Sequence, residues 1–272
     1  MQHKIIHHND LDGCCSAHLV YKHLHCDKDI EFIEVEYGRR IPEVSEGDDL
    51  WIVDFSFTPE IMEKWLETAS SVTWIDHHKS AVDKFATFHK LIPGVRKDGD
   101  KSACGLTHEY LYGTEMSYYV QAISNIDIHN ISEPDDLLFC LGMQAHEYSP
   151  ASRAWLRADE HPEMITNQGC DIYEYLMNEG VRYVADNGYW VKSTFGKVNG
   201  FVCNNGNIHS MKAYAPEADV WATFNYNPES KWTVILYSDT VNVEEIAKVF
   251  GGGGHPYAAG FQTNDIRVVL NR

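Results

Sequence analysis

The sequence predicts an α/β protein with a mainly parallel sheet and flanking helices, a helical connector, and a smaller C-terminal α/β domain with a mixed sheet. Two observations carry this prediction. Short apolar segments alternate with helical patterns over the first half of the chain, which is typical of βαβ units. A second group of strand-like segments begins near residue 194, after a long helical pattern. The predicted parts are residues 1–150, the connector 151–193, and residues 194–272.

The elements of the first half follow from apolar patterning and capping residues. Thr58 is the candidate N-cap of a helix that has Pro59 in its first turn. In parallel sheets, ligands bind beyond the carboxyl ends of the strands, so the residues that follow the strands are the candidates for a site. Strands are predicted at residues 4–8, 31–37, 50–55 and 72–75, and helices at 14–24 and 59–69.

The second half of the chain changes from helical to strand-like patterning. Residues 102–188 have few strand signals and include predicted helices at 134–145 and 162–187. The C-terminal part has predicted strands at 200–203, 220–226 and 232–237, with turn residues between them. A helix predicted at 243–250 runs into four consecutive glycines.

Charge and apolar content restrict the class of partner. The chain has 22 Lys and Arg against 40 Asp and Glu, a net charge of −18. Binding a long nucleic acid takes a basic track, which this sequence lacks, so any nucleic-acid substrate is expected to be short or a small phosphate ester. The longest apolar run is far below the ~18–20 residues of a membrane span, and the start resembles no signal peptide. A cytoplasmic protein with no membrane partner is therefore expected.

The seven cysteines are expected to be free thiols. Their number is odd, no C-x-x-C pair is present, and no export signal is recognised. Small buried side chains in a reducing compartment are the simplest interpretation.

The first candidate site follows the first predicted strand. His8, Asp10 and Asp12 are spaced two residues apart and are followed by a glycine, so a turning backbone can direct three metal ligands to one place. An EF-hand has a similar core, but it needs an acidic first ligand and a glutamate at the position that Leu19 occupies here. That alternative is therefore excluded.

Two further predicted strands end in potential ligands. Asp54 follows one apolar strand, and Asp76, His77 and His78 follow the next. An acid at the end of a buried strand has to be paired or metal-bound. Adjacent residues of an extended segment point to opposite faces, so His77 and His78 are expected to have separate roles.

These motifs, in this order, resemble the DHH phosphoesterase superfamily, named for the triplet that stands here at residues 76–78. The match continues with a later acid, Asp127, and with the sequence GGGGHPYAAGF at 251–261. That last segment resembles the GGGH motif of the DHH-associated domain in RecJ and nano-RNase type members.

The resemblance implies two divalent metal ions, most often Mn2+, with Mg2+ or Co2+ also suitable. Carboxylates and imidazoles without thiolates are consistent with such ions. Asp76 would orient a ligand histidine and His78 would face the scissile phosphate, which makes Asp54, Asp76 and His78 the expected catalytic residues. The implied ligands are His8 and Asp10 for one ion, Asp12, His77 and Asp127 for the other, and Asp54 between them.

The later acid is chosen partly by its order along the chain. Asp135 or Asp136 is the alternative to Asp127, and His129 is expected to be a helix-end histidine without a catalytic role. Ser102 is a candidate substrate-binding residue, with a helix N-cap as the alternative interpretation.

The glycine run is the second candidate for substrate binding. It lacks the Lys-Ser/Thr of a nucleotide P-loop. Successive glycines let backbone N–H groups approach a phosphate, so Gly253, Gly254 and His255 are expected to bind substrate. A flexible turn after the preceding helix is the alternative. Tyr237 stands where related C-terminal domains often carry an arginine, which weakens the expected grip on a phosphate.

The expected reaction is metal-assisted hydrolysis of a phosphodiester in very short oligonucleotides or small nucleotide phosphoesters, with mononucleotides as products. A cyclic mono- or dinucleotide phosphodiesterase is one alternative, and 3′-phosphoadenosine 5′-phosphate is a related substrate. A nucleotide-binding sensor without turnover is an alternative of another class. A homodimer is compatible with the sequence.

Overall fold

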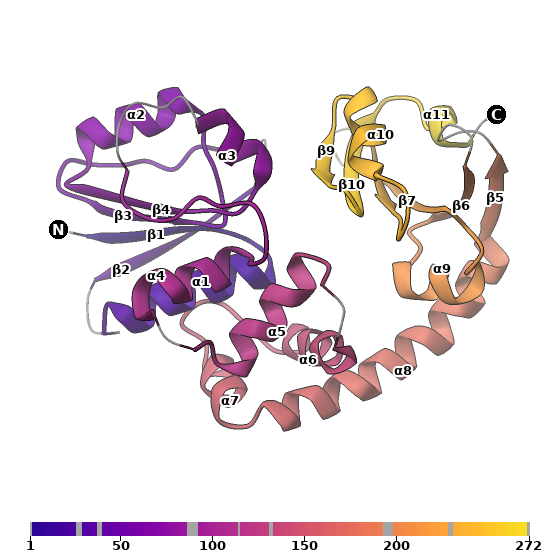
Figure 1. The fold of residues 1–272 in the computed structure, drawn as a ribbon, viewed down its shortest axis with the longest axis horizontal. Helices are drawn as coiled ribbons and strands as arrows, with labels where there is room; N and C mark the ends of the chain where they lie inside the picture. Colours follow the sequence, from indigo (N-terminus) through magenta and orange to yellow (C-terminus); the bar gives the residue numbers. More distant parts are fainter. Residues whose placement is uncertain are drawn as a thin grey trace. The chain divides into compact units, whose positions relative to one another are not determined.

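The computed structural model describes residues 2–25, 29–36, 40–85, 92–113, 115–130, 133–192, 198–227 and 231–270. The chain divides into two compact units, Met1–Asp171 and Ile172–Arg272 (Figure 1). The predicted connector, residues 151–193, is shared between these units. The predicted boundary at 193/194 and one cysteine, Cys26, lie outside the described residues.

The first unit is built on a parallel sheet with the strand order β2-β1-β3-β4. All three strand pairs are parallel, which confirms the predicted sheet. The register aligns His7 in β1 with Val53 in β3, and Val53 with Ile75 in β4. The residues that follow these three strands therefore leave the sheet at the same edge. The strands are β1 (His3–His8), β2 (Ile30–Val35), β3 (Asp49–Val53) and β4 (Ser71–Ile75).

Helices cover both faces of this sheet, with α1 and α4 on one face and α2 and α3 on the other (Figure 1). Neighbouring residues of β1 show why: Ile5 packs among Val20 and Leu106, whereas Ile6 packs among Trp65 and residues of β3 and β4. Burial of each such aliphatic side chain stabilises the fold by about 1.5–3 kcal/mol. These helices are α1 (Leu11–His23), α2 (Pro59–Thr68), α3 (Lys79–Phe85) and α4 (Ala103–Tyr112).

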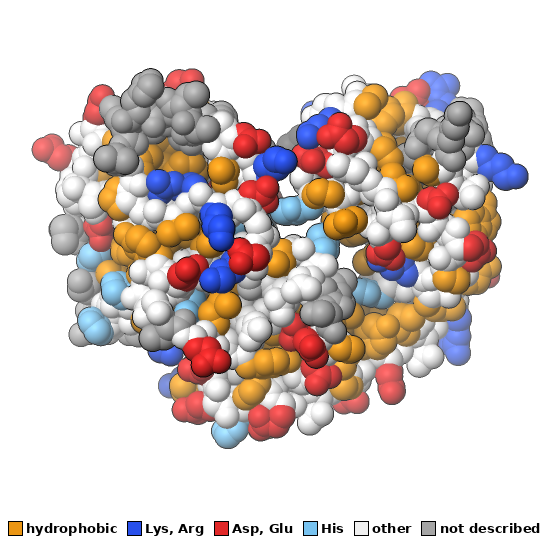
Figure 2. Space-filling view, in the orientation of Figure 1, with side chains coloured by type: hydrophobic (Ala, Val, Ile, Leu, Met, Phe, Trp, Pro, Cys, Tyr) orange, Lys and Arg blue, Asp and Glu red, His pale blue; other side chains and the backbone are white. Residues whose placement is uncertain are grey.

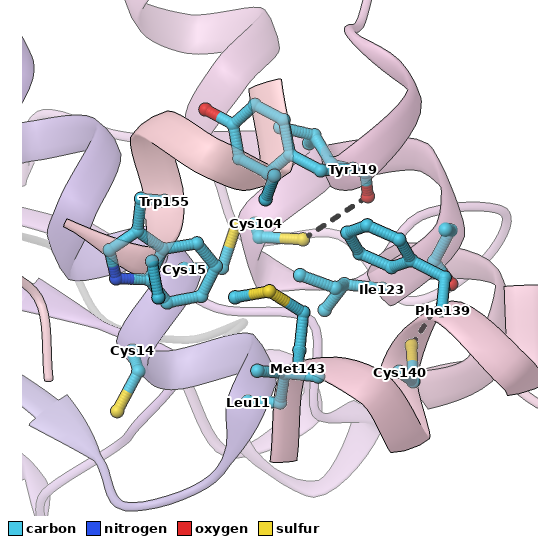
Figure 3. Close-up of a cluster of buried hydrophobic side chains, with 14 of the residues drawn as sticks. Leu11, Cys14, Cys15, Cys104, Tyr119, Ile123, Phe139, Cys140, Met143 and Trp155 are labelled. Atoms are coloured by element: carbon cyan, nitrogen blue, oxygen red, sulfur yellow. Dashed lines mark hydrogen bonds between the residues drawn. The ribbon is translucent and has the colours of Figure 1, made fainter. Parts of the chain in front are cut away.

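A further group of helices packs on α1 through a separate buried cluster (Figure 3). Trp155, Phe139 and Met143 are fully buried in it. Cys104 and Cys140 also lie there and donate weak hydrogen bonds to backbone carbonyls. All six described cysteines are free thiols, as predicted. The helices are α5 (Tyr118–Asp127), α6 (Pro134–Gln144), α7 (Ala154–Glu160) and the start of α8 (Pro162–Asn187).

The second unit contains a mixed sheet with the strand order β5-β6-β7-β8-β10-β9, which confirms the predicted mixed sheet. Only β6 and β7 pair in parallel among its described strands. Residues 188–192, predicted as part of the helical connector, form β5 instead, because they pair with β6. The elements are β5 (Gly188–Lys192), β6 (Asn199–Asn204), α9 (Ile208–Tyr214), β7 (Val220–Tyr226), β8 (Trp232–Tyr237), α10 (Val243–Val249), β9 (Gly253–His255), β10 (Ala258–Thr263) and α11 (Arg267–Leu270).

Helices also cover the second sheet on both faces. Val243 and Ala247 of α10 pack with Val234 and Leu236 of β8. On the other face, Met211 of α9 belongs to a separate cluster with residues of β6 and β7. The sequence signal for α9 is Asn207, whose side chain caps the helix by accepting hydrogen bonds from two backbone N–H groups.

The surface carries the excess of acidic residues that the composition requires. Figure 2 shows Asp and Glu side chains over both units, with Lys and Arg scattered among them. Among the described helices, none is both long enough and apolar enough to span a bilayer.

Candidate metal centre

The first candidate ligands lie where β1 gives way to α1. His8 is the last residue of β1, and Asp10 is the N-cap of α1, where its Oδ1 accepts the Gly13 N–H at 2.8 Å. A Cβ at Gly13 would lie 2.4 Å from the carbonyl oxygen of His8, so only glycine permits this tight strand-to-helix passage. Asp12, in the first turn of α1, is buried. The spacing of two residues in the sequence thus gathers all three side chains at the sheet edge.

Asp54 follows β3 in an unusual backbone conformation. Its φ is +55°, in the left-handed region that only a few per cent of non-glycine residues adopt. Its side chain is 2% exposed, and neither carboxylate oxygen has a hydrogen-bond partner. A buried carboxylate without donors is costly unless a cation compensates it. Strain and desolvation at the same residue indicate a functional role.

The two oxygens of Asp54 face two different groups of side chains. Oδ1 lies 3.5 Å from Nε2 of His77, and Oδ2 lies 3.7 Å from Nδ1 of His8. The His8 group is completed by Asp10, whose Oδ2 is 2.7 Å from His8 Nδ1. Both groups have a spacing that accommodates a metal ion. Asp54 is therefore shared by the two groups.

Nε2 of His77 is surrounded by carboxylate oxygens. It lies 3.2 Å from Oδ2 of Asp127, in addition to Asp54, and 4.0 Å from Oδ2 of Asp12. Asp127 is the last residue of α5, and its Oδ2 is buried without a hydrogen-bond partner. The four side chains come from the ends of β3 and β4, from α1 and from α5.

The carboxylates of this cluster are buried close to one another, and burial and mutual repulsion raise the pKa of two of them. Burial, together with Asp12 and Asp10, raises the pKa of Asp54 well above its ordinary value of 3.8. Burial and Asp12 likewise raise the pKa of Asp127, although His77 opposes the effect. Without a bound cation, the site therefore stabilises the protonated forms of Asp54 and Asp127. A cation bound there would stabilise the carboxylate forms instead.

His8 and Asp10 behave as an ion pair. Burial disfavours charge on both, but their mutual hydrogen bond outweighs it and raises the pKa of His8 to about 10. The same contact lowers the pKa of Asp10 to about 2. The proton on His8 lies where a divalent ion would bind, and such an ion would neutralise the nearby carboxylates more fully than the proton does.

Asp76 and His78 form a second, hydrogen-bonded pair. Oδ1 of Asp76 accepts from the backbone N–H of His78 at 3.1 Å and lies 2.8 Å from its Nδ1. Oδ2 accepts the hydroxyl of Ser56, a residue that the sequence did not single out. Nδ1 of His78 also lies 3.8 Å from Oδ1 of Asp54. Asp76 therefore orients His78, which is not one of the implied ligand histidines His8 and His77.

Comparison with known families identifies the domain that carries these residues. Residues 4–136 match the model described as the DHH family, N-terminal domain. These residues are a DHH-family domain. The predicted resemblance to the DHH family is thereby confirmed for these residues.

Individual relatives are distant. An uncharacterised protein of Acanthamoeba polyphaga mimivirus is 22% identical over 264 residues, which cover 93% of this chain and 61% of that protein. This chain therefore spans less than two thirds of that relative's length. Two solved structures share the fold. The pGpG-specific phosphodiesterase PggH of Vibrio cholerae is 15% identical with a TM-score of 0.57, and the match covers 100% of this chain and 96% of PggH. RecJ of Thermus thermophilus in complex with Mn2+ is 14% identical with a TM-score of 0.51, and the match covers 99% of this chain and 50% of RecJ.

The alternative acids lie elsewhere in the DHH domain. Asp136 is buried, and its Oδ2 accepts a hydrogen bond from Asn125 at 2.7 Å. Asp135 is exposed in the first turn of α6. His129 follows α5 with a φ of +57°. Among the three candidate acids, Asp127 is the one that faces His77.

Ser102 lies beside the DHH-domain ligands and is fully buried. It occupies the N-cap position of α4, but its hydroxyl does not cap the helix. The hydroxyl donates to Oδ1 of Asp12 instead, at 2.6 Å. This contact, between residues far apart in the chain, had no sequence signal.

The glycine run lies in the second unit, where most of it has a structural explanation. Gly251 and Gly254 have φ angles of +78° and +143°, and a Cβ at Gly252 would lie 2.0 Å from the carbonyl oxygen of Gly260. A Cβ at Gly253 would contact nothing within 4 Å. The run therefore forms the β9–β10 hairpin, which the sequence did not predict, and Gly253 is the glycine whose place packing does not explain.

His255 ends β9, and Tyr237 ends β8 in the same sheet. Tyr237 is paired with Ala258 on one side and with Trp221 on the other. Burial raises the pKa of Tyr237, so its hydroxyl remains neutral at physiological pH.

Proposed function

We propose that this chain is a metal-dependent phosphodiesterase that uses two divalent ions, most suitably Mn2+, to hydrolyse very short oligonucleotides or small nucleotide phosphoesters to mononucleotides. The observation that carries the proposal is the position of Asp54. It presents one carboxylate oxygen to each of two ligand groups, and the three histidines around it lie 3.5, 3.7 and 3.8 Å away, beyond ordinary hydrogen-bond distance. A shared carboxylate between neighbouring ions is an arrangement suited to phosphoryl chemistry.

The residues fit the proposed ions. His8 and Asp10 would hold one ion, Asp12, His77 and Asp127 the other, and Asp54 would contribute to both. Such ions supply an activated water and positive charge near the phosphate. Their positive charge would also offset a cluster of buried carboxylates in a protein of net charge −18.

His78 is proposed to act on the substrate. Its Nδ1 is fixed by Asp76, and Asp76 is in turn fixed by Ser56. The pair holds the imidazole orientation. In its imidazolium form, His78 can then donate from Nε2 to a phosphate oxygen as negative charge develops there. Burial opposes ionisation of Asp76, but its hydrogen bonds with His78 and Ser56 lower its pKa, which keeps it an acceptor.

The C-terminal unit is proposed to contribute substrate-binding residues of its own. Gly253, Gly254 and His255 offer backbone and imidazole donors on a short edge strand. Tyr237 offers a neutral hydroxyl in the same sheet. An aromatic hydroxyl grips a phosphate less strongly than an arginine, which favours a substrate with few phosphates.

The acidic charge of the protein and the named substrate of a related fold both bear on the size of the substrate. A long single strand requires a basic, aromatic-lined channel, which the excess of acidic residues disfavours. PggH, which shares the fold, is described as pGpG-specific, so its named substrate is a dinucleotide. A small nucleotide is therefore the class that both considerations favour.

A hydrolysis panel tests this proposal. The Mn2+-loaded protein is incubated with labelled RNA and DNA of two to five nucleotides, a long single strand, cyclic mono- and dinucleotides, 3′-phosphoadenosine 5′-phosphate and pyrophosphate, with chelator and Asp54→Asn as controls. Preferential release of mononucleotides from the shortest oligomers is expected. Exclusive cleavage of a cyclic nucleotide would overturn the substrate class, and nucleotide binding without turnover would favour the sensor.

A further inference from the structure

Asp12 is held by the first residues of α4. Its Oδ1 accepts the hydroxyl of Ser102 at 2.6 Å and the N–H of Cys104 at 2.9 Å. Its Oδ2 accepts the N–H of Ala103 at 2.9 Å and is the oxygen that faces His77. Three donors thus fix both the position and the rotation of this carboxylate, and they leave one oxygen directed at the proposed ion.

The donors also compensate charge. Asp12 is 2% exposed, and it lies at the N-terminus of a ten-residue helix, where the helix dipole and unpaired N–H groups favour an anion. Asp54 and Asp127, in the same group, have buried oxygens without any donor. Asp12 is therefore the carboxylate of this group that the protein itself positions by hydrogen bonds.

Ser102 is fixed from the opposite side by α5. Its backbone N–H donates to the hydroxyl oxygen of Ser124 at 2.9 Å, and both serines are buried. Ser124 is in α5, three positions before Asp127, about one helical turn. A Cβ at Gly105 would lie 2.9 Å from the Ser124 Oγ, so this glycine gives α4 and the serine the room for their contact.

We propose that Ser102 and Ser124 are positioning residues for the ion held by the His77 group. Ser102 sets Asp12, which comes from α1, and Ser124 ties Ser102 to α5, which carries Asp127. The two carboxylates, far apart in the chain, thus keep their separation before an ion binds. The proposal rests on the proposed metal-dependent function and deepens it. Ser102 orients the metal ligand Asp12 and does not bind the substrate.

The chain offers a matched control. Ser16 is a fully buried serine of the same unit, and its hydroxyl has no hydrogen-bond partner. Ser16→Ala removes the same atom as Ser102→Ala and Ser124→Ala without touching the Asp12 contacts. Any general effect of deleting a buried hydroxyl is therefore subtracted.

The experiment is calorimetric titration of each chelator-treated variant with Mn2+, with circular dichroism as the folding check. Ser102→Ala and Ser124→Ala are expected to lower the affinity for one of the two Mn2+ ions by about 10- to 100-fold, as loss of a group that orients a ligand typically does. The other ion, and both ions of Ser16→Ala, keep wild-type affinity. Excess Mn2+ restores activity of the Ser102 and Ser124 variants, and Ser102→Thr, which retains a hydroxyl, restores affinity.

Several outcomes overturn the proposal. Wild-type affinity for both ions in folded Ser102→Ala or folded Ser124→Ala contradicts it, while a wild-type protein that binds two ions leaves the proposed function intact. Equal weakening in Ser16→Ala shows a merely structural effect. A wild-type protein that binds no Mn2+ defeats the proposed function and this inference together.

Discussion

Nε2 of His77 lies 3.2 Å from Oδ2 of Asp127, although the two residues come from the end of β4 and from the last turn of α5. The contact joins the sheet to the helical layer at the proposed metal centre. It also distinguishes Asp127 from Asp135 and Asp136, which the sequence left as alternatives.

The first prediction concerns this choice of ligand. Asp127→Asn is expected to lower the rate of Mn2+-dependent hydrolysis by about 100-fold or more, because it removes the charge of a proposed metal ligand. Asp135→Asn is the matched control, since Asp135 is an exposed acid of the next helix. Steady-state kinetics on a short oligonucleotide measure both. Equal activity of the two variants would remove Asp127 from the site.

The second prediction is a trade-off between stability and function at Asp54. Asp54→Asn is expected to abolish turnover and yet to stabilise the metal-free protein, by about 0.5–2 kcal/mol, since it removes a buried carboxyl group that lies close to other carboxylates. Asparagine also tolerates the φ of +55° at this position. Thermal unfolding in chelator gives the comparison. A lower melting temperature for Asp54→Asn would show that the carboxylate is not a source of instability.

The third prediction is that metal-free stability falls as pH rises from 6.5 to about 10. The folded protein raises the pKa of His8 from 6.5 to about 10, so this stabilising contribution is complete below pH 6.5 and is lost as pH approaches about 10. The raised pKa values of Asp54 and Asp127 act in the same direction, from 3.8 upward. Unfolding of chelator-treated protein across this range provides the measurement, and stability that rises with pH would contradict the assignment.

Mn2+ affinity is expected to show the opposite dependence on pH, which is the fourth prediction. An ion that binds at His8 displaces its proton, so affinity increases by up to about tenfold per pH unit for each proton released. Calorimetric titration in buffers of different ionisation enthalpy counts those protons. An affinity independent of pH, without proton release, would exclude His8 as a ligand.

The fifth prediction separates two glycines of the hairpin. Gly252→Ala places a Cβ 2.0 Å from the Gly260 carbonyl oxygen and is expected to destabilise the second unit by about 1–3 kcal/mol. Gly253→Ala meets no atom within 4 Å and is expected to change stability by less than about 0.5 kcal/mol. If Gly253 contacts substrate, Gly253→Ala raises KM and leaves Mn2+ affinity unchanged. Wild-type KM would exclude Gly253 from the substrate site.

The sequence predicted the parallel sheet and its edge because the relevant signals are local. Apolar strands followed directly by Asp54 and by Asp76 are visible in the sequence, and parallel pairing brings their ends together. By contrast, the contacts of Ser102 with Asp12 and of Ser56 with Asp76 depend on how separate segments pack. The sequence around a serine does not indicate which distant side chain its hydroxyl contacts, so these hydrogen bonds could be identified only from the structure.

The C-terminal unit shows a different limit. A four-glycine run predicts conformational freedom, and the sequence could not distinguish a turn from a hairpin strand. The structure shows that Gly252 is required by the approach of β10, whereas Gly253 has open space beside it. Short edge strands such as β5 and β9 have too few residues for an apolar period to be recognised.

Electron paramagnetic resonance of the Mn2+-loaded protein tests whether two ions share Asp54. Two Mn2+ ions joined by one carboxylate are magnetically coupled, and their spectrum differs from that of isolated ions. We predict two bound Mn2+ per chain and a coupled spectrum in the wild-type protein, with the coupling lost in Asp54→Asn. A single uncoupled Mn2+ in the wild-type protein, or an unchanged coupled spectrum in Asp54→Asn, would contradict the account.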